Sequence, residues 1–193
     1  AEPILKRYRQ DTAALPITAF KDAVSRHGAD PVALATEFNV DLPCVFRRLA
    51  AIAPADFPDG QPRGLVACVA SGTLIFRKPV PGFEMPQYGA ACALWPLFQA
   101  SARPMTPIRQ AVRTVARDVQ EFQTFAFADL TYPSGYQNPS VVTSWMLISP
   151  HAGAAEQAID VGMSCRICGV EACPARREPS IVSHRREAVE EMQ

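Results

Sequence analysis

The chain has 193 residues, of which 48% are hydrophobic, and this is enough to bury the core of one domain or of one domain with an appendage. Nineteen Lys and Arg residues balance nineteen Asp and Glu residues, so the net charge indicates no surface for nucleic acid or membrane. No apolar run approaches the roughly 20 residues that span a bilayer, and no signal segment opens the chain, which predicts a cytoplasmic protein. The start at Ala1 rather than Met suggests a fragment of a longer polypeptide.

Helical signals fill residues 1–55. Thr18 can cap a helix that runs to His27. Gly28 follows at the position of a left-handed C-terminal cap, a conformation that glycine favours. Asp30, which precedes a proline, and Asp41 can cap two further helices with apolar residues at helical spacing. We therefore expect a small helical unit at the start of the chain.

Part of this unit, residues 33–52, also has the rhythm of a helix-turn-helix, with Arg47 and Arg48 on the second helix. Helical hairpins with this pattern are common as scaffolding, and scaffolding is the reading we favour over DNA recognition.

The hydrophobic period shortens after a linker at 54–62 that is rich in Pro and Asp. Strands are predicted at 65–79 as a hairpin around Ser71 and Gly72, and within 108–116, 122–128 and 141–149. Residues 88–104 are predicted as a helix or covered segment, and residues 132–140 as a loop.

Helices followed by a meandering antiparallel sheet indicate an α+β fold in which helices cover one face of the sheet. We expect three parts: a helical lead-in at 1–55, a sensing domain at 56–161 and a Cys-rich tail at 162–193.

Three of the six cysteines lie within nine residues, at Cys165, Cys168 and Cys173. A C-x2-C turn points two thiolates at one ion or cluster, and the third can close from the next turn. Metal or iron–sulfur binding is favoured over disulfides, because the chain lacks a secretory signal and arginines surround the thiols. A fourth ligand is missing locally, and apart from the remote His184 no candidate follows.

These residues carry a family resemblance. The segment resembles the C-terminal signature of the short-chain fatty acyl transcriptional regulators, bacterial proteins in which a helix-turn-helix domain precedes an acyl-CoA-sensing domain. The matching positions are Gly162, Cys165, Arg166, Cys168, Cys173, Arg176 and Pro179, and the departures are Val170, Arg177, Glu178 and Ser180. Residues 91–95, ACALW, are similar to a second family pattern, with Ala93 where proline is usual, and residues 26–52 are similar to the family's helical lead-in.

The resemblance implies a GAF-like fold, a four-iron four-sulfur (4Fe–4S) cluster held by cysteines, and sensing of short-chain acyl-CoA. It also implies Cys92 as the fourth thiolate, since this remote cysteine lies in a family-like motif. Cys44 and Cys68 are expected to be small core residues. DNA binding would come from a helix-turn-helix domain outside this chain, and palindromic operators would imply a homodimer.

Zinc remains an alternative, because four thiolates also suit a tetrahedral zinc ion. The alternative function is a zinc-stapled nucleic-acid or protein interaction module, with contacts from Arg47, Arg48 and the Arg-rich segment 176–186.

An enzyme is not expected. The three histidines, His27, His151 and His184, form no H-E-x-x-H pair, and the chain has neither a G-x-S-x-G elbow nor a phosphate-binding loop.

A ligand pocket has its own support in the predicted sheet. Its apolar wall is expected from Phe122, Phe125, Phe127, Trp145 and Met146, and its phosphate contacts from Arg77, Lys78, Arg103, Arg109 or Arg113. From this set we select Arg77, Arg103, Arg109, Phe125 and Trp145 as ligand-binding candidates.

Overall fold

The computed structural model describes residues 2–115, 118–150 and 157–182. Four helices come first: α1 (Glu2–Ala14), α2 (Ile17–His27), α3 (Pro31–Phe38) and α4 (Leu42–Ala51), followed by the 3-10 turn η1 (Pro54–Asp56). Within the described residues, no helix has the length and apolar character needed to cross a membrane.

The helix ends test the predicted caps. The Asp30 carboxylate accepts hydrogen bonds from the two amides that open α3, and the Asp41 carboxylate accepts one from the amide of Cys44 in α4, so both caps are confirmed. Gly28 adopts the expected left-handed conformation after α2, with φ of 63°. The predicted Thr18 cap is wrong, because α2 begins at Ile17 and no side chain caps it.

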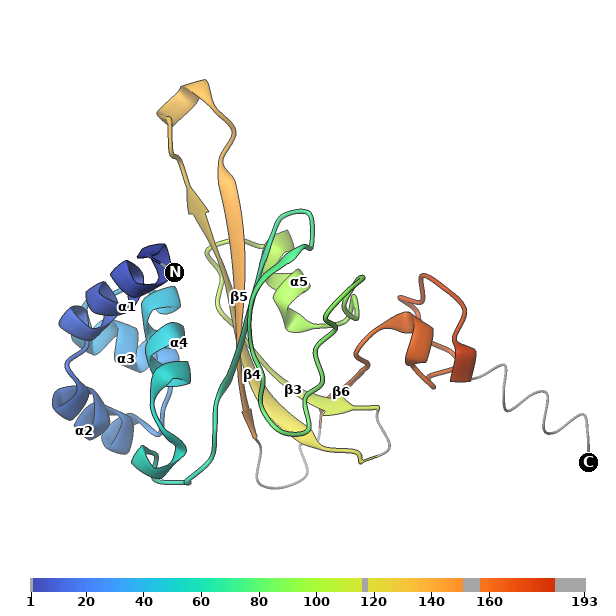
Figure 1. Ribbon diagram of the computed structural model, residues 1–193, viewed down its shortest axis with the longest axis horizontal. Helices are drawn as coiled ribbons and strands as arrows, with labels where there is room; N and C mark the ends of the chain where they lie inside the picture. The colour runs from blue at the N-terminus through green and yellow to red at the C-terminus, as the bar shows by residue number, and fades with distance from the viewer. Residues whose placement is uncertain (1, 116–117, 151–156, 183–193) are drawn as a thin grey trace, which may run out of the picture.

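The remaining elements build a six-stranded sheet (Figure 1). Its strands are β1 (Gly64–Val69), β2 (Leu74–Lys78), β3 (Ile108–Thr114), β4 (Glu121–Thr131), β5 (Val141–Pro150) and β6 (Ile159–Val161), in the order β2-β1-β5-β4-β3-β6. All pairings are antiparallel except that of β3 with β6. The predicted α+β class is confirmed, while the strand order differs from a simple meander because β1 pairs with β5.

The sheet carries a hydrophobic core on each face. Helices α1–α4 cover one face, where Phe20, Phe46 and Leu49 pack against Leu65 and Leu147 of the strands. The lead-in therefore shares a core with the sheet.

Helix α5 (Pro96–Ala102) and the segment before it cover the other face (Figure 1). The Phe83 ring contacts both the fully buried Trp95 and Phe122 of β4 there, with ring centroids 5.2 and 5.4 Å away. The prediction for residues 88–104, a helix or covered segment, is confirmed by α5 and by this packing. Cys68 is buried in this core and Cys44 in the core of the opposite face, as expected.

Beyond β6 the chain forms a compact segment with the 3-10 turn η3 (Cys165–Ile167), which lies beside the β3–β6 edge of the sheet (Figure 1). The loop between β4 and β5 contains the 3-10 turn η2 (Gly135–Gln137) and is exposed throughout, as expected for residues 132–140.

Candidate functional site

The Cys-rich segment is attached to the loop that carries Cys92. The Cys92 amide donates a 3.0 Å hydrogen bond to the carbonyl oxygen of Met163, and the Trp95 indole Nε1–H donates one of 2.9 Å to the carbonyl oxygen of Gly162. The Arg177 guanidinium donates to the carbonyl oxygen of Ala91. Hence the two sequence segments that carry the candidate ligands lie together, although more than 70 residues separate them.

The four candidate thiols occupy one region. Cys92, Cys165 and Cys168 are buried and Cys173 is half-buried, and none forms a disulfide. Burial raises the pKa of Cys92, and the nearby charges of Cys168 and Cys173 raise it further. Within the described residues, no three His, Cys, Asp or Glu side chains are arranged so that they could hold a metal ion.

Two arginines organise the segment around these thiols. The Arg176 guanidinium donates to the carbonyl oxygens of Cys165, at 3.3 Å, and of Cys168, at 3.4 Å. Burial opposes ionisation of the Cys165 thiol, but hydrogen bonds and the charge of Arg177 outweigh it and hold its pKa below the ordinary value. Soft sulfur donors beside fixed positive charge are a suitable donor set for an anionic metal–thiolate centre.

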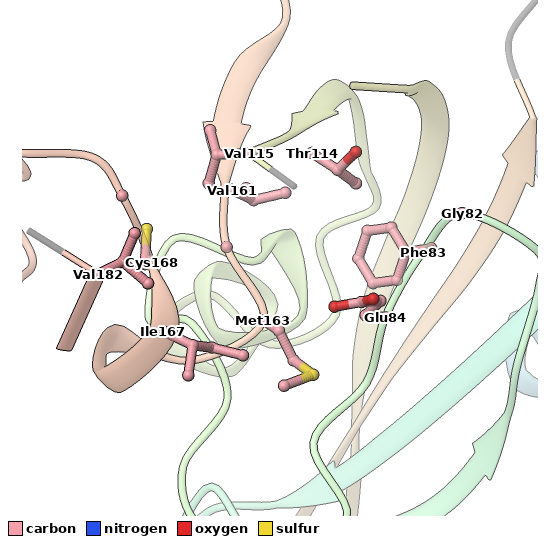
Figure 2. A pocket seen from close by; sticks show the side chains of 12 residues that line it. Gly82, Phe83, Glu84, Thr114, Val115, Val161, Met163, Ile167, Cys168 and Val182 are labelled. Atoms are coloured by element: carbon pink, nitrogen blue, oxygen red, sulfur yellow. The ribbon is translucent and has the colours of Figure 1, made fainter. Parts of the chain in front are cut away.

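A cavity of about 560 Å³ separates this segment from the sheet (Figure 2). Cys168 and Ile167 of the segment line one side, and Phe83 and Glu84 of the loop before α5 line the other, with Met163 between them. Its lining includes no Arg or Lys, so the cavity lacks the cations that phosphate groups need.

A second cavity, of about 310 Å³, lies where α1 and α4 meet β1 and β2. Its apolar lining includes Leu65 and the aromatic side chains of Tyr8, Phe76 and Trp145. The basic residues Arg7, Arg47, Arg48 and Lys78 also line it, together with Asp11. Strand pairing explains why Phe76 and Trp145 line the same cavity. Both residues pair with Ala67 of β1, so their side chains lie on the same face of the sheet, the one that α1–α4 cover.

The predicted pocket residues do not line one cavity. Trp145 lies in the second cavity, whereas Phe125 and Arg109 line a separate space of about 100 Å³, with the Arg109 guanidinium 5.8 Å from the Phe125 ring centre. Arg77 is paired with Val66 and so faces the side opposite to Trp145, and Arg103 is exposed after α5.

Other residues of that expected set also separate. Phe122 and Met146 lie in the core under α5, on the face opposite to Phe125 and Phe127, so the five apolar residues form no common wall. Lys78 lines the second cavity, and Arg113 instead pairs with Asp160 at 2.7 Å.

The arginines of the predicted helix-turn-helix make internal contacts. Arg47 forms two hydrogen bonds to the Asp11 carboxylate, at 2.7 and 2.8 Å, and Arg48 is buried with its Nε 3.0 Å from the carbonyl oxygen of Leu15. These internal contacts agree with the scaffolding role favoured from the sequence rather than with nucleic-acid contacts from Arg47 and Arg48.

Of the three histidines, only His27 lies within the described residues. His27 pairs with Glu37 at 2.6 Å on the exposed ends of α2 and α3, while His151 and His184 lie outside the described residues. Sequence reasoning did not identify Tyr8 and Phe76 as cavity residues. Within the local patterns of helix α1 and edge strand β2, each is an apolar residue without an assigned packing partner.

Comparison with known proteins places this fold. A family model described as "Short-chain fatty acyl coenzyme A regulator, C-terminal" matches residues 59–193. The propionyl-CoA carboxylase regulator of Cereibacter sphaeroides is 25% identical over 186 residues, and the HTH-type transcriptional regulator RamB of Mycobacterium tuberculosis is 25% identical over 193 residues. Each alignment covers 92% of this chain and 40% of the relative, so the chain spans well under half the length of either protein.

A solved structure of a Mycobacterium tuberculosis transcriptional regulator has a TM-score of 0.75 over 90% of this chain and 56% of that one, at 22% identity. This likeness supports the fold alone. The two curated relatives are named as regulators, which agrees with the expectation of a non-enzymatic chain.

Proposed function

We propose that this chain, which belongs to the short-chain fatty acyl coenzyme A regulator family, is the part of a transcriptional regulator that senses short-chain acyl-CoA. Family membership carries the proposal, and the name of the Cereibacter relative, a regulator of propionyl-CoA carboxylase, suggests propionyl-CoA as the first ligand to test.

The cavity between α1, α4 and the β1–β2 hairpin is the best candidate for the ligand site. At about 310 Å³ it lies within the size range of small-molecule pockets, and a short acyl group with part of the pantetheine arm can occupy such a space. Its apolar wall suits the acyl chain, and Arg7 and Lys78 suit the phosphates of coenzyme A. The other large cavity has no cation in its lining and is less suitable.

For the cysteines we propose a 4Fe–4S cluster held by Cys92, Cys165, Cys168 and Cys173. A tetrahedral zinc ion with Zn–S bonds of about 2.3 Å requires sulfur atoms about 3.8 Å apart. In a 4Fe–4S cluster each thiolate binds a different iron atom, which allows a wider arrangement. The choice of the cluster over zinc rests on the resemblance of residues 162–179 and of the segment around Cys92 to the family's cysteine motifs. When bound, it would supply a covalent staple between the tail and the loop before α5.

The regulatory step is a shift between conformations. A ligand that binds one arrangement of α1 and the sheet more tightly than another increases the population of that arrangement. In the longer protein, this change would alter how paired helix-turn-helix domains meet their DNA site.

Calorimetric titration with propionyl-CoA tests the ligand and its site together. Arg7→Ala removes a cation from the cavity, and a lost charge-assisted hydrogen bond of about 1.5–3 kcal/mol should weaken binding about tenfold or more. Arg9→Ala, two residues along the same helix and outside the cavity lining, is the matched control and should bind as the unchanged chain does. No binding by the unchanged chain would refute the sensor function, and equal binding by both variants would refute the site.

A further inference from the structure

Lys78 places a half-buried amine in the wall of the cavity between α1, α4 and the β1–β2 hairpin. It follows Phe76 by two residues on β2, so both side chains lie on the helix-covered face of the sheet. Its strand partner is Leu65 of β1, which also lines the cavity. The Lys78 Nζ donates a 2.9 Å hydrogen bond to the carbonyl oxygen of Arg63, and this bond fixes the amine beside an apolar wall.

Lys78 differs in its chemistry from the other cations of this cavity, which are arginines. A guanidinium keeps its proton, whereas a lysine amine loses its proton more readily when it is withdrawn from water. Burial lowers the pKa of Lys78 below the ordinary lysine value. At neutral pH, Lys78 therefore has a larger fraction of neutral, nucleophilic amine than an exposed lysine has.

The chain has two other lysines, and their surroundings are different. Lys6 is exposed on α1, and the Lys21 amine pairs with the Asp56 carboxylate at 2.6 Å. Neither side chain lines the cavity. Lys6 and Lys21 are therefore internal references for the reactivity of Lys78.

We propose that Lys78 is a modification site that takes the acyl group of a short-chain acyl-CoA bound in this cavity. The inference rests on the proposed ligand and its site. The neutral Nζ attacks the thioester carbonyl carbon, so that a C–N bond forms and the C–S bond breaks. The electron pair of the broken bond leaves with the sulfur of CoA, which takes up the proton that the nitrogen releases. The products are an N-acyl-lysine and free CoA, and no oxidant, reductant or further reactant takes part.

The arrangement of the cavity suits this orientation of the ligand. Trp145 pairs with Ala67, two residues along β1 from the partner of Lys78, and the Arg47 guanidinium lies 5.3 Å from the Trp145 ring centre. Arg7 lines this cavity and also a neighbouring polar space of about 260 Å³. An acyl-CoA with its thioester beside Lys78 therefore extends past Trp145, and this orientation assigns its phosphates to Arg7 alone.

Acylation changes the cavity in two ways. It removes the positive charge of Lys78, and it leaves the acyl chain covalently in the space that a second ligand needs. An acylated chain therefore binds further acyl-CoA more weakly, and the modification persists after the free ligand has gone.

Peptide mass spectrometry after incubation with propionyl-CoA tests the proposal. Lys78 should gain a propionyl group at least about tenfold faster than Lys6, because binding holds the thioester beside the amine. An excess of CoA without an acyl group should slow the reaction at Lys78 and leave that at Lys6 unchanged. Hydroxylamine cleaves thioesters on cysteine but not amides, so the modification of Lys78 should survive it.

Lys78→Arg keeps the positive charge and removes the nucleophile. This variant should still bind propionyl-CoA in calorimetry and should gain no propionyl group at position 78, and circular dichroism checks that its fold is intact. Lys21→Arg is the matched control and should be acylated at Lys78 as fast as the unchanged chain is.

The rates in the unchanged chain separate this inference from the proposed function. If the chain binds propionyl-CoA but Lys78 reacts no faster than Lys6, the inference is refuted and the ligand site stands. If calorimetry shows no binding and Lys78 reacts no faster than Lys6, both are refuted. Binding together with fast acylation at Lys78, slowed by CoA, supports both.

Discussion

Trp95 and Gly162 join the two chain segments that carry the candidate cysteines, because the buried indole Nε1–H of Trp95 donates a 2.9 Å hydrogen bond to the Gly162 carbonyl oxygen. Together with the bond from Cys92 to Met163, it holds the Cys-rich segment against the loop before α5 through protein contacts alone. These protein contacts by themselves position the segment.

Replacing this indole tests the contact. Trp95→Phe keeps an aromatic ring but leaves the Gly162 carbonyl oxygen without its donor, and we expect a loss of about 1–3 kcal/mol in the free energy of unfolding, a fall of several degrees in melting temperature. Trp145→Phe is the matched control, because the buried Trp145 Nε1–H lies near the Asp129 carboxyl without a hydrogen bond of ordinary geometry. Equal losses in the two variants, measured by thermal unfolding, would argue against the hydrogen bond.

Gly162 also leaves the space that the Cys168 thiol, a candidate metal ligand, occupies. A Cβ atom at Gly162 would lie 2.9 Å from the Cys168 Sγ, so Gly162→Ala must displace that thiol. We expect this variant to retain less than about half of the iron and sulfide of the unchanged chain when both are purified anaerobically. At Gly169 the nearest atom to an added Cβ is 3.9 Å away, an ordinary contact, so Gly169→Ala should retain the full content. Full content in both variants would contradict the position of Cys168 in the centre.

The Arg47–Asp11 pair joins α4 to α1, and its two side chains are only 16% and 8% exposed. Arg47→Met leaves a buried carboxylate unpaired and should destabilise the fold by about 3 kcal/mol in chemical denaturation. Arg47→Met with Asp11→Asn should cost less than the sum of the single changes. The exposed Arg26–Glu37 pair is the control, and Arg26→Met should cost about 1 kcal/mol or less. If the double variant lost as much unfolding free energy as the two single variants together, the two side chains would have no coupling energy.

Asp129 makes stability depend on pH. Burial raises the pKa of this carboxyl, so the folded chain holds the proton more tightly than the unfolded chain does. The contribution of Asp129 to the free energy of unfolding is therefore largest below the ordinary aspartate pKa. It decreases as the pH rises through the higher pKa of the folded chain. Asp129→Asn should remove this decrease and raise the melting temperature at neutral pH. Melting curves from about pH 4 to pH 7 check this, and an unchanged slope in the variant would contradict it.

Local chemistry predicted most of the elements. Asp30 and Asp41 could be assigned as caps because their signals involve only neighbouring residues, and the turn at Gly72 marks its hairpin in the same way. β6 was missed because three residues are too few to show a period, and its parallel pairing with β3 joins segments 47 residues apart.

The candidate site was less predictable for the same reason. The link from Cys92 to the tail came from family resemblance and not from spacing. Phe122 and Phe125 were grouped in one wall, although an odd separation along a strand places side chains on opposite faces. The cavity beside Trp145 depends on α1 meeting β2 across more than 60 residues, which no local pattern indicates.

Anaerobic native mass spectrometry of the freshly purified chain tests the central claim, that four cysteines join the tail to the loop before α5 through an iron–sulfur cluster. The account predicts a mass increment of four irons and four sulfides, lost in Cys92→Ser and kept in Cys68→Ser, whose thiol is buried in the core. One bound zinc ion in place of the cluster, or an undiminished cluster in Cys92→Ser, would contradict it.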